Sequence, residues 1–230
     1  ETGEKPDALV VTGGLSFDKK KFGRTFERCT DMDVSIIDHE EFTARLDDGS
    51  AADAAVVVLF SYSKKLTKDR REAFRGMING GTGLVVLHHA IIGYPKWPQF
   101  CEILGGRYFH NKMEWKGETY EPSDFKHDVD MNVHVADADH PITRGMQDFT
   151  IHDETYSGMW VAPNNRVLLT TDAQTADPEL MWVRTWQDAR AAYIQPGHGP
   201  SIYGQKPYQE LVRRAMRWTA RLQPVAPEKE

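Results

Sequence analysis

Three short segments of the chain place histidine beside residues that can orient it or exchange a proton with it. The first, Val86–Ala90 (VLHHA), runs from an apolar strand directly into His88 and His89. In α/β hydrolases and related folds this turn presents the nucleophile. No Ser or Cys stands here, so we expect no covalent acyl chemistry. An imidazole at the turn can act as base, ligand or hydrogen-bond donor. The structural alternative is that His88 only satisfies backbone groups inside the turn.

The second segment, Ile151–Tyr156 (IHDETY), brings His152, Asp153, Glu154 and Tyr156 together after a short apolar stretch. Adjacent carboxylates point in different directions, so Asp153 and Glu154 are not expected to form a close pair. One of them can orient a histidine while the other faces solvent or substrate. A solvated acidic pair at the start of a helix explains the same residues equally well.

The third segment, Gln195–Pro200 (QPGHGP), carries a histidine flanked by glycines and prolines. Glycine lets the backbone approach a ligand closely, and a histidine on such a loop is rarely a core residue. His198 is therefore the best single functional candidate. His110 and His127 are expected to line a lid, whereas the segment around His140 is read as structural, with His-Pro shaping a bend.

A metal site is a further interpretation of these segments. Two imidazoles and a carboxylate suit zinc, iron, manganese or nickel, and His88, His198 and Glu154 would be the ligands. No closely spaced pair of histidines supports such a site, so the fold would have to assemble it. The sequence therefore leaves a divalent-metal cofactor open.

The elements that must position these residues alternate between strands and helices in the first half of the chain. A buried strand is expected where an apolar run ends at a turn signal, and a helix where apolar residues recur on one face. The expected strands are Ala8–Thr12, Val34–Ile37, Ala54–Phe60 and Leu84–Leu87. Helices are expected at Lys19–Arg28, after the capping residue Thr67, and at Phe100–Leu104. Such alternation implies parallel strands, whose carboxyl ends are where ligands gather.

The second half of the chain is less regular and is expected to add antiparallel strands. The candidates are Met131–Val135, Phe149–Ile151, Val167–Leu169, Leu180–Val183 and Ala191–Ile194, before a final helix that includes Leu211, Ala215, Trp218 and Leu222. We predict one α/β domain over residues 1–230, with frayed ends at 1–6 and 224–230. Its architecture is a three-layer sandwich around a mostly parallel sheet, with an antiparallel extension and a lid or edge from Arg107–Asp130.

Composition excludes some partner classes. The net charge is −6 and the pI about 5.9, whereas a nucleic-acid surface needs a clustered basic excess. The basic pair Arg213-Arg214 is read as part of a solvated helix face. No apolar run approaches the roughly 20 residues that cross a bilayer. The chain begins with Glu1, so a removed leader stays open and so does localisation. Cys29 and Cys101 are expected to be small buried residues, and the fold would not need a disulfide between them.

Taken in order, several segments resemble the ThuA-like (trehalose utilisation) family. They are Gly83–Ala90 (GLVVLHHA), His140–Phe149 (HPITRGMQDF), the stretch from Asp153 to Tyr156, Gly197–Gly199, Tyr208 and Arg214–Trp218. The family pattern often reads GLHAA where this chain has VLHHA. The extra His89 is a departure that can alter the site.

The resemblance implies a flavodoxin-like sheet related to class I glutamine amidotransferases. His88 then stands at the position of the amidotransferase cysteine, and His198 matches the loop of the amidotransferase histidine. Pro200 stands where that enzyme has glutamate. The resemblance therefore implies a shared scaffold without glutaminase activity, and a sugar-derived ligand such as a keto-sugar.

Three functions remain open. The first is an enzyme acting on a sugar or keto-sugar by proton transfer, with His88 and His198 as base and acid and with Asp153 or Glu154 orienting them. The second is a non-catalytic sugar-binding or regulatory module, and the third is a homodimer paired through exposed aromatic residues. For the first two, the predicted ligand contacts are His89, His110, His152, Tyr156 and Trp160.

Overall fold

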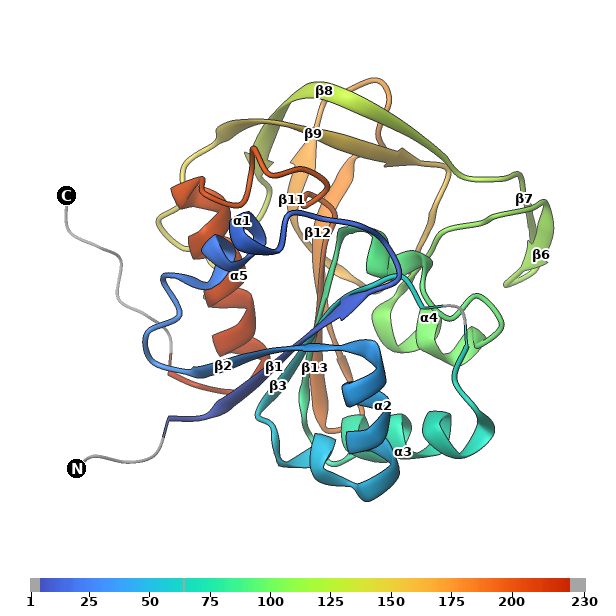
Figure 1. Ribbon diagram of the computed structural model, residues 1–230. Helices are drawn as coiled ribbons and strands as arrows, with labels where there is room; N and C mark the ends of the chain where they lie inside the picture. Colours follow the sequence, from blue (N-terminus) through green and yellow to red (C-terminus); the bar gives the residue numbers. More distant parts are fainter. Residues whose placement is uncertain (1–4, 64, 224–230) are drawn as a thin grey trace.

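The computed structural model describes residues 5–63 and 65–223 of the chain. Its centre is a nine-stranded sheet with the order β2-β1-β3-β4-β13-β12-β11-β8-β9 (Figure 1). The five strands from β2 to β13 pair in parallel, and the four that follow pair antiparallel. The parallel strands are β1 (Asp7–Gly13), β2 (Asp33–Asp38), β3 (Val56–Ser61), β4 (Gly83–Leu87) and β13 (Ala189–Ile194).

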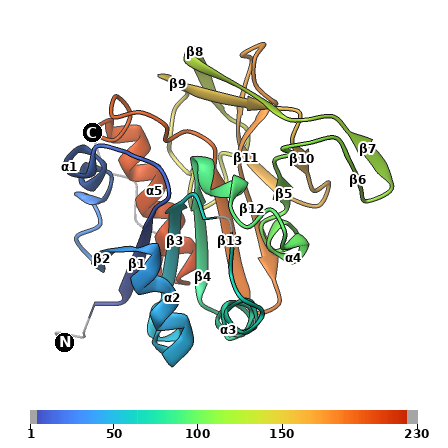
Figure 2. The same cartoon turned by 45° about the vertical axis from the view of Figure 1, so that its right-hand side comes forward.

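Helices cover both faces of this sheet, which makes the fold a three-layer α/β sandwich of flavodoxin-like type (Figure 2). One face packs against α1 (Lys19–Gly23) and α5 (Lys206–Thr219). The other packs against α2 (His39–Asp48), α3 (Lys68–Asn79) and α4 (Pro98–Leu104). Short 3₁₀ turns at η1 (Arg24–Phe26), η2 (Ser50–Asp53) and η3 (His88–Ile92) complete the helical layers.

Two hydrophobic cores lie on the two faces because side chains alternate along a strand. In β1, Ala8 and Val10 face α1 and α5, whereas Leu9 and Val11 face α2 and α3. Burying both faces explains why β3 and β4 are apolar at nearly every position, and all residues of both strands are buried. The uninterrupted run over Ala54–Phe60 in the sequence therefore correctly predicts a central strand.

Two helical predictions need correction. The expected helix over Lys19–Arg28 is only α1, followed by the 3₁₀ turn η1. Helix α2 is not among the expected elements, because its sequence HEEFTARLDD has few apolar residues. Asp38 caps it by accepting a hydrogen bond from the backbone N–H of Glu41 at 2.8 Å, a type of cap that stabilises a helix by about 1 kcal/mol.

The antiparallel part forms a ribbon that crosses the carboxyl edge of the parallel strands (Figures 1 and 2). Its long members are β8 (Asp124–Val135) and β9 (Phe149–Ser157), with β11 (Arg166–Thr171) and β12 (Glu179–Trp186) leading back to β13. The expected lid segment holds β5 (Gly106–Arg107), the hairpin of β6 (Met113–Trp115) and β7 (Glu118–Tyr120), and the start of β8. Strand β10 (Trp160–Val161) pairs with β5.

Other expectations concern the chain ends, the cysteines and membranes. Most of the frayed residues predicted at 1–6 and 224–230 lie outside the described part, but the carbonyl of Pro6 accepts from the N–H of Asp33 at 3.1 Å. Cys29 and Cys101 are buried and free, as predicted. Within residues 5–63 and 65–223, no helix has the length and apolar character that a bilayer crossing requires.

Arg214 does not belong to a solvated face, contrary to the expectation for Arg213-Arg214. Its guanidinium is buried, pairs with Glu210 at 2.6 Å and donates to the carbonyls of Ile142 at 3.3 Å and Arg144 at 2.7 Å. This contact ties α5 to the segment His140–Phe149, so two of the segments that resemble the ThuA-like family hold each other in place. The carboxylate and the two carbonyls make burial of the charge possible, and the charge pattern of the sequence does not show these partners.

The buried ring of His140 gives a prediction about acid stability. Its Nδ1 accepts from the N–H of Ile142 at 3.2 Å, and burial, followed by the charge of Arg166, lowers its pKa to about 4. Below pH 6.5 the unfolded chain takes up a proton that the folded chain does not. The contribution of His140 to the free energy of unfolding is therefore fully present above pH 6.5 and is lost as the pH falls toward 4. Between pH 7.5 and pH 5, we expect His140→Asn to lose about 2 kcal/mol less of its unfolding free energy than the wild type loses.

Urea unfolding at pH 7.5 and pH 5 measures the difference. His134→Asn is the control, because His134 is half-exposed and its pKa is raised by the hydrogen bond with Asp148. We expect His134→Asn to keep the decrease in unfolding free energy between pH 7.5 and pH 5. An unchanged pH slope in His140→Asn would show that His140 is not the source of the acid sensitivity.

Candidate functional site

His88 stands at the end of β4 in a backbone conformation that non-glycine residues seldom adopt. Its φ is +49°, and such a geometry persists only where the surrounding structure holds it. Two contacts hold it here. The Tyr193 hydroxyl donates to the His88 carbonyl at 3.3 Å, and the ring Nδ1 lies 2.7 Å from the carbonyl oxygen of Gln195 at the end of β13. The ring is fully buried.

The contact with Gln195 decides which nitrogen of His88 carries the proton. A carbonyl oxygen only accepts, so Nδ1 must be the N–H donor. Nε2 then faces the cluster, as a lone pair in the neutral ring and as an N–H donor to Glu154 in the protonated ring. Nε2 lies 3.0 Å from the Tyr156 hydroxyl, 3.3 Å from Nδ1 of His198 and 3.4 Å from Oε1 of Glu154.

Asp153 fixes the loop that carries His198. Its carboxylate accepts from the backbone N–H groups of Gly197 at 2.5 Å, His198 at 3.1 Å and Gly199 at 3.2 Å. Gly197 has φ +144°, and a Cβ there would lie 2.8 Å from the Tyr208 hydroxyl and 3.2 Å from the His88 Cβ. Only glycine fits this position, so the QPGHGP sequence is needed for the close approach of the loop to His88.

Glu154 lies at the centre of the histidines. Its carboxylate is 6% exposed, and Oε2 is 3.2 Å from Nδ1 of His198 and 2.5 Å from Nδ1 of His127. His127 reaches this carboxylate because β8 has a bulge between Lys126 and Val129. Bulges redirect side chains and are common next to active sites.

The charge state of the cluster follows from these contacts. Burial raises the pKa of Glu154, but the hydrogen bond to His88 and the charges of His88 and His198 outweigh burial, so the net pKa is below its ordinary value. The pKa of His198 is lowered, first by burial, and the Glu154 charge opposes this only in part. The pKa of Tyr156 is raised well above 10 by burial. At neutral pH the cluster is therefore an ionised carboxylate beside a neutral His198 imidazole and an intact phenol.

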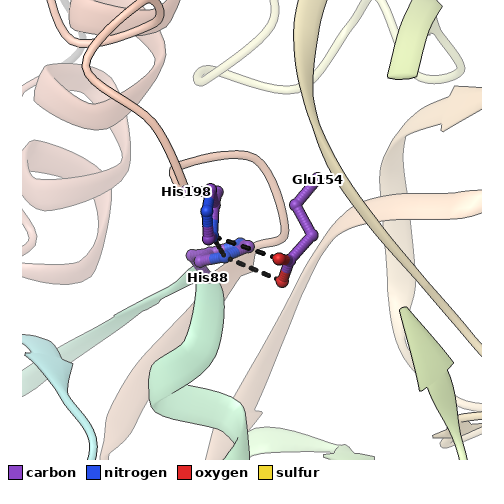
Figure 3. A group of neighbouring side chains, drawn as sticks. All are labelled: His88, Glu154 and His198. Carbon is purple, nitrogen blue, oxygen red and sulfur yellow. Dashed lines mark hydrogen bonds and ion pairs between the residues drawn. The ribbon is translucent and has the colours of Figure 1, made fainter. Parts of the chain in front are cut away.

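The structure brings together the three residues at the core of the sequence-based prediction. One donor atom each from His88, Glu154 and His198 lies within 4.8 Å of the other two. The three side chains come from the start of η3 just after β4, from β9 and from the loop after β13 (Figure 3). Tyr156 contacts this group, with its ring stacked 4.9 Å from that of His88. Asp153 adjoins it through the loop backbone.

Of the other predicted ligand contacts, His89 adjoins the cluster, with its ring 5.5 Å from that of His88, whereas His152 and Trp160 lie elsewhere. The ring of His89 is buried 4.5 Å from that of Phe60, and burial, followed by the charge of His88, lowers its pKa to about 3. His152 pairs with Asp130 at 2.8 Å on the exposed side of the ribbon. Trp160 packs on Trp115, with ring centroids 5.4 Å apart, in a small hydrophobic cluster of its own.

His110 lines a cavity of about 540 Å³ that adjoins the cluster through Tyr108. The Tyr108 ring packs 5.4 Å from Tyr156 and 5.7 Å from His110. The other lining residues are Tyr62, Pro95, Lys96, Arg107, Phe109, Asn111 and Met113. This volume lies in the range of small-molecule sites.

The sequence predicts a lid position for His127 and indicates no role for Tyr108 or Gln195. The signal for His127 was weak, because a bulge breaks the alternation that would have shown which way the side chain points. Gln195 has a clearer signal, since it directly follows strand β13 and begins the glycine loop. Its side chain donates to the Glu154 carbonyl at 2.7 Å, which joins the third segment to the second.

Comparison with known proteins gives one family and several structures. The family model ThuA, described as trehalose utilisation, matches residues 7–219. Among curated protein sequences, none matches this chain.

The solved structures agree in fold. A ThuA-like protein from Parabacteroides merdae is 17% identical with a TM-score of 0.79, and the match covers 98% of this chain and 94% of that one. A ThuA-like protein from Bacteroides uniformis is 19% identical with a TM-score of 0.68 over 95% and 93% of the two chains. PurLQS from Thermotoga maritima is 15% identical with a TM-score of 0.57 over 93% and 99%.

Proposed function

Because this chain belongs to the ThuA family of trehalose utilisation, we propose that it is an enzyme acting on a sugar or keto-sugar by proton transfer at His88, Glu154 and His198. Family membership connects the chain with carbohydrate utilisation, and the chemistry is our inference. The observation that carries the proposal is the convergence of two imidazoles and a buried carboxylate from three distant segments, with contacts of 3.2–3.4 Å.

Proton abstraction next to a carbonyl needs a base within hydrogen-bond reach of the substrate. Of the imidazoles that contact Glu154, two are about half-exposed: His198 at 47% and His127 at 50%. Glu154 orients each ring through Nδ1, which leaves the other nitrogen of each ring to take a proton from the substrate or return one. His88 is fully buried and so acts on Glu154 and His198 rather than as a freely accessible base.

The cavity beside Tyr108 offers a place for the sugar. Tyr62 and Tyr108 provide aromatic rings and His110 a polar group, a combination suited to a sugar with one apolar face and hydroxyls at its edge. The Tyr108 and Tyr156 rings pack against each other, so a ligand in this cavity lies next to the cluster. By holding the sugar in one orientation, these residues would reduce the entropic cost of bringing it to the proton-transfer groups.

A non-catalytic sugar-binding module is the second candidate. It is favoured by the burial of His88 and Glu154, which leaves His198 and His127 as the accessible members of the cluster. In that case, keto-glycosides would bind in calorimetry and remain unchanged after long incubation.

The test is turnover of keto-glycosides by His198→Ala. We expect a decrease of about 100-fold or more, the usual contribution of a positioned proton-transfer group. His152→Ala is the matched control, because His152 is equally exposed and also pairs with a carboxylate, but on the outer side of the ribbon. Equal turnover in wild type and His198→Ala would remove His198 from the mechanism.

A further inference from the structure

We propose that His88, Glu154 and His198 bind a divalent transition-metal ion of the zinc type, through Nε2 of His88, a carboxylate oxygen of Glu154 and Nδ1 of His198. The three donors surround one point at the carboxyl ends of β4 and β13 (Figure 3). Two imidazoles and one carboxylate form a donor set that zinc enzymes use, with a fourth position left open for water or substrate.

The spacing of the donors fits such an ion. The contacts are 3.3 Å between the two histidine nitrogens, 3.4 Å from His88 to Glu154 and 3.2 Å from His198 to Glu154. In a tetrahedral site with bonds of about 2.1 Å, neighbouring donors lie roughly 3.4 Å apart. Oε1 of Glu154 faces His88 and Oε2 faces His198, and one donor atom from each residue lies within 4.8 Å of the other two. The two nitrogens and the carboxylate therefore lie close enough to bind one ion without a movement of the backbone.

The groups behind the donors also fit a metal site. Histidine ligands usually donate their second N–H to a carbonyl or carboxylate, which fixes the tautomer. His88 does so through Nδ1 to Gln195. The loop of His198 is held by Asp153 and by the Tyr203 hydroxyl, which donates to the Gly197 carbonyl at 3.0 Å.

Two further residues face the same point. The Tyr156 hydroxyl lies 3.0 Å from Nε2 of His88 and also interacts with Glu154, so its hydrogen can turn to the carboxylate when Nε2 binds an ion. His127 contacts the same carboxylate through Nδ1. With His88 and His198 engaged as ligands, His127 is the half-exposed imidazole left to exchange a proton.

The binding site stands on geometry alone, whereas its chemical role rests on the proposed function. In the proposed reaction, the ion would polarise a carbonyl oxygen of the sugar-derived substrate. It would stabilise the negative charge that forms on this oxygen when a proton is removed from the carbon next to the carbonyl. No electrons are transferred, since the proton moves to a base and the charge stays on the oxygen bound to the ion.

The experiment is calorimetric titration of the chelator-treated full chain with Zn²⁺, followed by the visible spectrum of the Co²⁺ form. We expect one ion per chain and the absorption bands of a four-coordinate cobalt site. Loss of an outer partner already weakens metal sites by about 10–100-fold, so His198→Ala and Glu154→Gln should weaken binding by about 100-fold or more. His152→Ala controls for adventitious binding at His152, Asp128 and Asp130 and should leave the titration unchanged.

The outcomes separate the two proposals. Absence of stoichiometric binding, or loss of the bound ion in His152→Ala with retention in His198→Ala, overturns the metal site. Zinc binding without turnover of any keto-glycoside supports the site and counts against the proposed function. Turnover that persists after the ion is removed supports the proposed function and overturns the chemical role given to the ion.

Discussion

Glu154→Gln is expected to lower the turnover of a keto-glycoside by about 10²–10⁴-fold, the range that positioned proton-transfer groups contribute. Glu154 is the residue on which the accessible imidazoles converge, with contacts of 3.2 Å to His198 and 2.5 Å to His127. Glutamine keeps the shape but has no negative charge, and its NH2 group would meet the Nδ1 nitrogens that contact the wild-type carboxylate. Both imidazoles would lose the partner that orients them.

Steady-state kinetics of the purified variant give kcat and KM separately. We expect the loss mainly in kcat, because the cavity beside Tyr108 that is proposed to bind the sugar does not include Glu154. Glu121→Gln is the control, since Glu121 is an exposed carboxylate that pairs with Lys112 at 2.5 Å on the same lid segment. A Glu154→Gln variant with wild-type kcat would exclude a catalytic role for this carboxylate.

The sequence predicts the position of His88 well because the apolar run before it and the strand–helix alternation of the first half both place it at the end of a parallel strand. An uninterrupted apolar run that ends in a turn indicates a buried parallel strand, and the carboxyl end of such a strand is where ligands bind. The expectation that Asp153 and Glu154 point in different directions also agrees with the structure. Asp153 binds the backbone N–H groups of the His198 loop, and Glu154 faces the imidazoles.

The sequence allows Glu154 and His88 to share a site, but the path of the chain that brings them together could not be predicted from it. Strand β9 is the last strand in the pairing order, five places from β4. Glu154 reaches His88 only because the ribbon of β8 and β9 crosses the carboxyl edge of the parallel strands (Figure 1). That path depends on long-range pairing and on the bulge at His127, neither of which leaves a periodic pattern in the sequence. The same ribbon turns His152 outward to Asp130.

Asp153→Ala is expected to destabilise the folded chain by about 3–5 kcal/mol, because it removes a buried charged acceptor and leaves three backbone N–H groups without it. These groups belong to Gly197, His198 and Gly199. Since the loop would no longer be held against β9, His198 should move from Glu154 and turnover should also fall. Urea unfolding gives the free energy, and hydrogen exchange of the three amides reports on the loop.

Asp130→Asn is the control for this experiment. Asp130 is an exposed carboxylate of the neighbouring strand that pairs with the half-exposed His152, so its substitution should change stability by less than about 0.5 kcal/mol. The hydrogen-exchange result separates positioning from chemistry. If Asp153 acted on the substrate itself, Asp153→Ala would lose turnover while the loop amides stayed protected. Loss of protection at Gly197–Gly199 together with loss of turnover identifies Asp153 as a positioning residue that acts through His198.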